Sequence, residues 1–275
     1  MIKRRILLQL HTNLDYRTNT SWLQFIGVLF FLLLCLPIII GIFLALPFWL
    51  YEQANPNTNK LLLESISNSS YDLVSLLLLI LYIMKYKPMR ALVLPAINFQ
   101  VLKSFRMYIY VLIYYAISLL ADMFILDELF PLAVQEQSDA LELSTLEHYP
   151  LLLILSGGIF APIFEELICR GIFLRFFEEK FTFWPAAILS SLLFGIAHTY
   201  SLGIMVSAFV TGIFACLLYK QTKSIVPAIL LHILTNVIAF SIHTFRLLIA
   251  LLSISRNLYI LINNIQNKPH VVKYN

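Results

Sequence analysis

The sequence predicts an all-α, polytopic integral membrane protein with seven to eight transmembrane helices. Apolar residues make up 60% of the 275 residues, charged residues make up only 12%, and the mean hydropathy is +0.84. Soluble globular proteins have about 45–50% apolar and about 25% charged residues. The composition therefore excludes a soluble enzyme, a disordered chain and a nucleic-acid-binding protein. The same composition predicts that the chain lies in the lipid bilayer, which is therefore its expected partner.

Apolar runs along the chain give the number of helices. A transmembrane helix needs roughly 20 mainly apolar residues. Eight runs approach this length, at residues 22–50, 71–86, 106–126, 149–170, 184–202, 203–219, 224–243 and 244–262. We expect Pro37 and Pro47 to bend or end the first helix. The last run is the weakest candidate, because Arg246 and Asn257 interrupt it.

Basic residues lie on one side of the eight alternating spans. They occur in residues 1–21, in the connections near residues 85–106, 175–180 and 220–223, and in the tail. The other side receives Lys60, Arg246 and the stretch 122–147, which contains acidic residues and no Lys or Arg. Because cytoplasmic loops carry an excess of Lys and Arg, both termini are predicted to be cytoplasmic. We expect residues 1–21 to lie on anionic headgroups and the acidic stretch to be an external loop.

A few ionisable or amide side chains fall inside the predicted spans. They are Glu165, Glu166 and Arg170 in the fourth span, His198 near the end of the fifth, and His232 with Asn236 in the seventh. An ionisable group at the bilayer centre costs on the order of 2.5–3.5 kcal/mol, so such a group is a candidate for function. The concentration of these groups on three of the predicted helices is the main functional signal of the sequence.

The spacing of these side chains indicates how they face one another. Glu166 and Arg170 are four residues apart, so they can pair on one helical face. Glu165 points about 100° away from that pair and can face a cavity. Pro162 cannot donate a backbone hydrogen bond, which predicts a kink just before Glu165. His232 and Asn236 share a face in the same way.

This set of groups is suited to amide hydrolysis. A carboxylate and a neutral imidazole that converge on one water can make it nucleophilic by general-base catalysis. A second imidazole and an amide can donate hydrogen bonds to the oxyanion of a tetrahedral intermediate. Glu165, His198 and His232 could instead bind zinc with an open fourth position. The residues leave a metal-free mechanism and a zinc mechanism open, so the cofactor is not fixed.

Three motifs resemble a known family. Glu165-Glu166-Leu-Ile-Cys-Arg170 matches EExxxR, Phe194-Gly-Ile-Ala-His198 matches FxxxH, and His232-Ile-Leu-Thr-Asn236 matches HxxxN. In this order, they resemble the CPBP family of intramembrane proteases, which groups type II CAAX prenyl endopeptidases with Abi and bacteriocin-immunity proteins. The resemblance implies that Glu165 and His198 activate water and that His232 and Asn236 stabilise the oxyanion. Glu166, Arg170 and Phe194 would support the site.

The resemblance divides the chain into regions and suggests its setting. Residues 22–148 would form accessory helices and the acidic loop, residues 149–244 the catalytic core, and residues 245–275 the last helix and a cytoplasmic tail. The expected substrate is a membrane-associated or lipidated peptide or protein. The usage of Asn, Ile, Tyr and Lys with only 8 Gly favours an AT-rich bacterial genome, so the expected location is a bacterial plasma membrane. Two other functions stay open: a non-catalytic partner of another membrane protein, such as an immunity factor or a sensor-kinase regulator, and a proton-coupled transporter.

Overall fold

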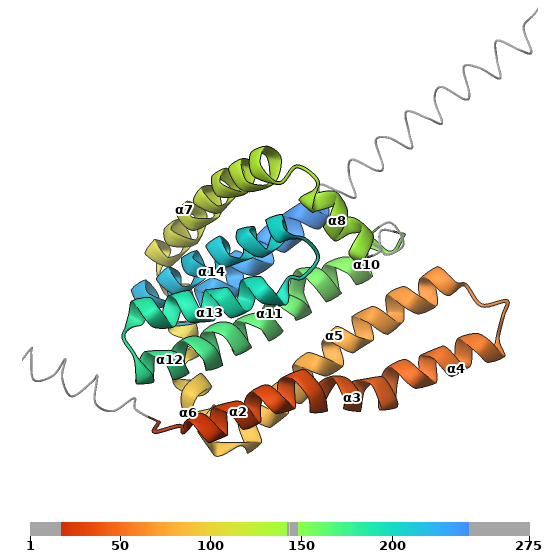
Figure 1. Ribbon diagram of the computed structural model, residues 1–275, viewed down its shortest axis with the longest axis horizontal. Helices are drawn as coiled ribbons and strands as arrows, with labels where there is room; N and C mark the ends of the chain where they lie inside the picture. The colour runs from red at the N-terminus through yellow and green to blue at the C-terminus, as the bar shows by residue number, and fades with distance from the viewer. Residues whose placement is uncertain (1–17, 142, 144–147, 242–275) are drawn as a thin grey trace, which may run out of the picture.

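The computed structural model describes residues 18–141, 143 and 148–241, and every regular element in these residues is a helix (Figure 1). Five helices are long and apolar enough to cross a membrane, and they span Trp22–Ala54, Lys60–Lys85, Phe105–Leu129, Pro150–Lys180 and Leu202–Thr222. Two shorter apolar helices span Phe183–Ala197 and Val226–Ser241. The predicted all-α membrane fold is therefore confirmed. The predicted run 244–262 and most of residues 1–21 lie outside the described residues.

The first membrane helix continues past both of its prolines. It consists of α2 (Trp22–Phe30), the π-helical segment η1 (Phe31–Cys35), α3 (Leu36–Ile40), the π-helical segment η2 (Gly41–Ala45) and α4 (Leu46–Ala54). Ser21 and Gln24 form a capping box at its start. Pro37 and Pro47 each follow a π-helical segment. Because proline lacks an N–H, the preceding turn loses a hydrogen bond and widens, but the helix does not end.

The second helix, α5 (Lys60–Lys85), is longer than the predicted run that began at residue 71. The Asn59 side chain caps its start by accepting from the backbone N–H of Leu62. A connection with α6 (Lys87–Val93) and two 3₁₀ segments, η3 (Leu94–Ala96) and η4 (Phe99–Lys103), then leads to α7 (Phe105–Asp122). This connection lies against the start of helix Val226–Ser241, because the backbone N–H of Ile225 donates to the carbonyl of Ala96.

The helix Pro150–Lys180 passes through the middle of the bundle. It consists of α10 (Pro150–Leu153), η6 (Ile154–Phe160), α11 (Ala161–Glu166), η7 (Leu167–Leu174) and α12 (Arg175–Lys180), of which η6 and η7 are π-helical. The predicted apolar run of this span, residues 149–170, ends at Arg170. That boundary is wrong, because the Arg170 side chain is fully buried and the helix continues to Lys180.

Two antiparallel helices, α13 (Phe183–Ala197) and α14 (Leu202–Thr222), pack beside this long helix (Figure 1). The predicted run 184–202 extends beyond α13, which ends at Ala197, so His198 follows the helix instead of lying inside it. Ser201 caps the start of α14 by accepting from the backbone N–H of Ile204. The close α13–α14 contact and the long helix together hold the polar residues of the core.

The two ends of the bundle differ in charge, and they lie at the left and right of Figure 1. We call the end formed by α6, η4, α12 and the last turn of α14 the basic end. We call the end formed by residues 55–59, η5 (Met123–Leu129), α8 (Ala133–Ala140) and residues 198–201 the acidic end. Lys60 lies at the acidic end and pairs with Glu52 at 3.1 Å. The acidic stretch 122–147 was expected to be a loop, but its described part is mainly helical in η5 and α8.

Candidate active site

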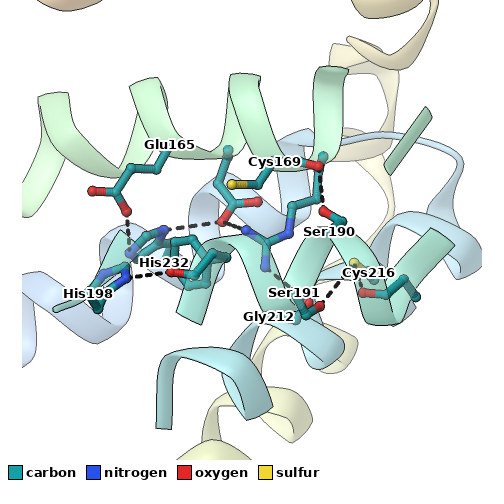
Figure 2. Close-up of polar contacts among 12 residues, drawn as sticks. Glu165, Cys169, Ser190, Ser191, His198, Gly212, Cys216 and His232 are labelled. Carbon is teal, nitrogen blue, oxygen red and sulfur yellow. Dashed lines mark hydrogen bonds and ion pairs between the residues drawn. The ribbon is translucent and has the colours of Figure 1, made fainter. Parts of the chain in front are cut away.

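The four side chains predicted to act together line one cavity. The cavity has a volume of about 690 Å³, and Glu165, His198, His232 and Asn236 all form part of its wall. Glu165 lies on α11, His198 follows α13, and the other two lie on helix Val226–Ser241. Figure 2 shows Glu165, His198 and His232 gathered on one side of α11. The three sequence motifs therefore meet in space.

The backbone places Glu165 and His198 at matching depths. Glu165 precedes the end of α12 at Lys180 by 15 residues, and His198 follows the start of α13 at Phe183 by 15 residues. Both distances correspond to about 22 Å of helix. Because α12 and α13 are joined by a short turn at the basic end, the antiparallel helices bring the carboxylate and the imidazole to the same level.

Glu166 and Arg170 form a buried ion pair behind the cavity wall. The guanidinium Nη1 donates to Glu166 Oε1 at 2.7 Å, and Nη2 donates to the backbone carbonyl of Gly212 on α14 at 3.0 Å. The exposed fractions of the two side chains are 0% and 1%. Neither residue lines the cavity. The predicted pair is therefore present, and it links the long helix to α14.

His232 lies between the two glutamates. Its Nδ1 atom is 3.2 Å from Glu166 Oε1, and its Nε2 atom is 3.7 Å from Glu165 Oε2 (Figure 2). An ionised carboxylate only accepts hydrogen bonds, so Nδ1 carries the proton in this contact. The Nε2 atom is consequently the one directed toward Glu165 and the cavity. Glu166, held by Arg170, fixes the orientation of the ring.

His198 is oriented by its own helix. Its Nδ1 atom lies 2.8 Å from the backbone carbonyl of Phe194, which can only accept. The proton is therefore on Nδ1 in the neutral ring, and Nε2 is left as an acceptor for a water in the cavity. The Phe194 ring lies 4.7 Å from the Arg170 guanidinium and makes edge contacts with both imidazoles. Phe194 thus contacts Arg170 and both imidazoles, and its supporting role stays a prediction.

Asn236 is held by a carbonyl that the helix Pro150–Lys180 does not use. Its Nδ2 atom donates to the backbone carbonyl of Gly157 at 2.8 Å. The backbone N–H of Ala161 bonds to Ser156, and the next residue, Pro162, has no N–H. The Gly157 carbonyl therefore takes the Asn236 amide in place of a helical partner. One N–H of the amide is used in this way, and the second can serve a ligand in the cavity.

The zinc set expected as an alternative requires Glu165, His198 and His232 around one ion. In the described ranges 18–141, 143 and 148–241, no three His, Cys, Asp or Glu side chains are placed to hold a metal ion. Nδ1 of His232 is held by Glu166 and Nδ1 of His198 by a backbone carbonyl, so each ring has only Nε2 to offer to a ligand in the cavity. In the described geometry, Glu165, His198 and His232 do not surround one point as three zinc ligands do.

The cavity also contains carboxylates that the sequence did not single out. Asp72 on α5 accepts from the Ser156 hydroxyl, and Asp122 at the end of α7 accepts from the Ser207 hydroxyl. Asp72 was overlooked because the second span was drawn from residue 71, which placed it at the edge. The helix-capping residue Asn59 is the sequence signal that indicates the longer α5. Asp122 was assigned to the external stretch.

Comparison with known proteins relates the same part of the chain to membrane peptidases. Residues 147–238 match the family described as type II CAAX prenyl endopeptidase Rce1-like. A segment of 94 residues is 35% identical to the protein named "Putative membrane peptidase YdiL" of Bacillus subtilis (strain 168), and it covers 34% of this chain. The match covers 38% of that relative, so the chain spans less than half the length of the curated protein it matches. No solved structure matches the chain.

The matched segment contains all three motifs and all four residues that meet in the cavity. The family match and the Bacillus relative thus agree with the resemblance that the motifs indicated. The sequence motifs and this match relate the helical core at residues 147–238 to the Rce1-like type II CAAX prenyl endopeptidases, in agreement with the resemblance to the CPBP family.

Proposed function

We propose that this protein is an intramembrane endopeptidase that hydrolyses a peptide bond in a membrane-associated or lipidated peptide. The observation that carries the proposal is the convergence of Glu165, His198, His232 and Asn236 on one cavity inside a helical bundle. A cavity of about 690 Å³ lies within the 300–1,000 Å³ that is usual for ligand pockets. The family match supports a peptidase over the other functions that the sequence left open.

Glu165 is proposed to be the general base. A water held between its carboxylate and Nε2 of His198 gives a proton to Glu165, and the water oxygen attacks the carbonyl carbon of the scissile peptide bond. His198 can accept a hydrogen bond from this water because its Nδ1 proton is directed at the Phe194 carbonyl. The carbon–oxygen double bond becomes a single bond, and the carbonyl oxygen becomes an oxyanion.

Asn236 and His232 are proposed to stabilise that oxyanion. The free N–H of the Asn236 amide is one donor, and Nε2 of His232 is the second when the ring carries both protons. Collapse of the intermediate breaks the carbon–nitrogen bond, and the proton on Glu165 passes to the leaving amine. The water has then been divided between the two products, and Glu165 is ionised again.

The proposed location is a bacterial plasma membrane. Seven apolar helices in the described residues indicate an integral membrane protein, and the similar membrane peptidase comes from Bacillus subtilis. The proposed partners in this membrane are a peptide or protein substrate and another membrane protein. The proposed mechanism uses only the side chains of the chain itself.

The test compares cells that produce the wild type with cells that produce Glu165→Ala. Mass spectrometry of the membrane and secreted fractions maps new peptide termini in each strain. We expect termini that depend on the wild type, because removal of a general base lowers the rate by about 10²–10⁴-fold. Glu178→Ala, on the same helix but outside the cavity, is the matched control and should retain the wild-type termini.

A reporter peptide built around the mapped cleavage site then gives kinetic constants in proteoliposomes. Identical termini in the wild type and Glu165→Ala, with equal protein abundance, would show that proteolysis is not the function. That result would favour the non-catalytic membrane partner.

A further inference from the structure

The cavity occupies one half of the bundle. The helices contribute to its wall from the segments nearest the acidic end: Asp72 in the first half of α5, Asp122 at the end of α7, Ser156 in η6 and Ser207 in the first half of α14. Helix Val226–Ser241 contributes its second half, from His232 onward. The cavity therefore extends from Glu165 toward the acidic end.

The wall of the cavity reaches the surface at that same end. Asn68 on α5, Ala140 on α8 and Ala239 on helix Val226–Ser241 line the cavity and are exposed. They come from three elements, so the wall of the cavity meets the surface of the molecule in this half of the bundle. A substrate can therefore reach the four site residues from the acidic end of the molecule.

Access from the basic end is closed. Directly behind the cavity wall lie Glu166 and Arg170, which are almost completely buried. Beyond them, Ile172, Leu174 and Phe176 have no exposed surface. The Phe176 ring stacks on Phe25 of α2 at 4.0 Å, which joins the first membrane helix to this packed layer. Well-packed interiors leave few spaces larger than a water molecule, so this layer separates the site from the basic end.

The difference in charge between the two ends indicates which side of the membrane the cavity faces. The basic end carries Lys and Arg residues in each of its connections, and the acidic end carries Lys60, which is paired with Glu52. Lys and Arg accumulate in cytoplasmic connections. We propose that the cavity opens on the extracytoplasmic face of the membrane. If the protein is the peptidase proposed above, its substrates are peptide segments presented on that face instead of cytoplasmic tails.

Cysteine accessibility tests this proposal without depending on proteolysis. Ala161→Cys places a thiol in the cavity wall one turn before Glu165, Gln135→Cys places one on exposed α8, and Gln221→Cys places one at the exposed basic end. Each variant is treated in intact cells with a membrane-impermeant, negatively charged methanethiosulfonate. The wild type gives the background, in which Cys169 and Cys216 are buried and Cys35 is half-buried in the first membrane helix. Thr211→Cys is a second cavity position if Ala161→Cys does not accumulate.

We expect external reagent to modify positions 161 and 135 and to leave position 221 unmodified, with the reverse pattern in inside-out vesicles. Modification of position 161 only together with position 221, or only from the inside, would overturn the proposal. Modified Ala161→Cys should also lose at least about tenfold in reporter cleavage, whereas modified Gln135→Cys should not. External modification without cleavage by the unmodified wild type would instead refute the peptidase function and leave the accessible cavity established.

Discussion

Arg170 is a cation with no exposed surface, and its partners are divided between two helices. The guanidinium bonds to Glu166 and to the Gly212 carbonyl, and its carbon lies 4.7 Å from the Phe194 ring centre. A planar guanidinium can satisfy partners in two directions, whereas a lysine ammonium is a compact charge on a flexible stem. Arg170 therefore holds Glu166, and through it His232, in a fixed position.

We expect Arg170→Lys to lower both stability and activity. The ammonium cannot reach both hydrogen-bond partners, and an unsatisfied buried group costs about 1–3 kcal/mol. Thermal unfolding of the purified protein in detergent measures the first effect, and the reporter assay measures the second. Arg175→Lys is the matched control, because Arg175 Nη1 has the Tyr219 hydroxyl as its partner at 2.7 Å. Equal loss of stability in both variants would contradict the role given to Arg170.

Single residues were largely predictable at this site because helical spacing is local. The four-residue intervals of Glu166–Arg170 and His232–Asn236 indicated shared faces, and the structure shows Glu166 and Arg170 paired. The contact of His232 with both glutamates could not be predicted, because it depends on how two helices 66 residues apart pack together. The same holds for the Gly157 carbonyl that holds Asn236.

At the scale of elements, Pro162 has a consequence for a neighbouring helix. By withdrawing an N–H it leaves the Gly157 carbonyl to Asn236. We expect Pro162→Ala to supply a backbone N–H that competes for the Gly157 carbonyl and releases the Asn236 amide. The kcat should fall about tenfold with little change in KM, a smaller loss than the roughly 10²–10³-fold that removal of an oxyanion donor causes. Reporter kinetics of Pro162→Ala, Asn236→Ala and the double variant measure the coupling between the two positions.

The coupling distinguishes positioning from general damage to the helix. If Pro162 acts through Asn236, the double variant should be no slower than Asn236→Ala alone. Effects that multiply would contradict this prediction. Pro37→Ala is the matched control, because Pro37 also follows a π-helical segment but lies in the first helix, outside the cavity wall.

Gly212 tests the contact between α13 and α14. A Cβ atom at this position would lie 3.0 Å from Ser191 Cβ and 3.1 Å from Arg170 Nη2, so these side chains would have to shift by a few tenths of an ångström. We expect Gly212→Ala to destabilise the protein by about 1–3 kcal/mol, measured by thermal unfolding. Gly27→Ala is the control, since a Cβ there meets nothing within 4 Å. A Gly212→Ala variant as stable as Gly27→Ala would show that the contact is not tight.

The sequence predicted which segments are helices better than where they end. Apolar runs revealed the long helices, but Arg170 was mistaken for a boundary because its buried partners lie on the same helix and on α14. The start of α5 was missed because its first turns are polar where they line the cavity. In both cases, a polar residue that serves the interior has the same appearance in a sequence as one that meets water.

At the scale of the whole molecule, α13 is too short for an average bilayer. Its 15 residues extend about 22 Å, whereas the hydrocarbon core is about 30 Å thick. Lys220 lies over the rings of Phe183 and Trp184, a contact typical of the membrane interface, so the start of α13 is fixed there. The shortfall of several ångströms consequently falls at the other end, at residues 198–201, beside the site.

A shortfall of this kind thins the surrounding bilayer or draws water down to the helix end. The protein should therefore respond to the length of the lipid acyl chains around it. We expect reporter cleavage to fall severalfold from phosphatidylcholine with 14-carbon chains to phosphatidylcholine with 22-carbon chains, at equal amounts of folded protein. Cleavage that is independent of chain length would show that the site is hydrated by another route. If cleavage falls as expected, membrane thickness is a physical regulator of this peptidase, and it acts through the length of one helix.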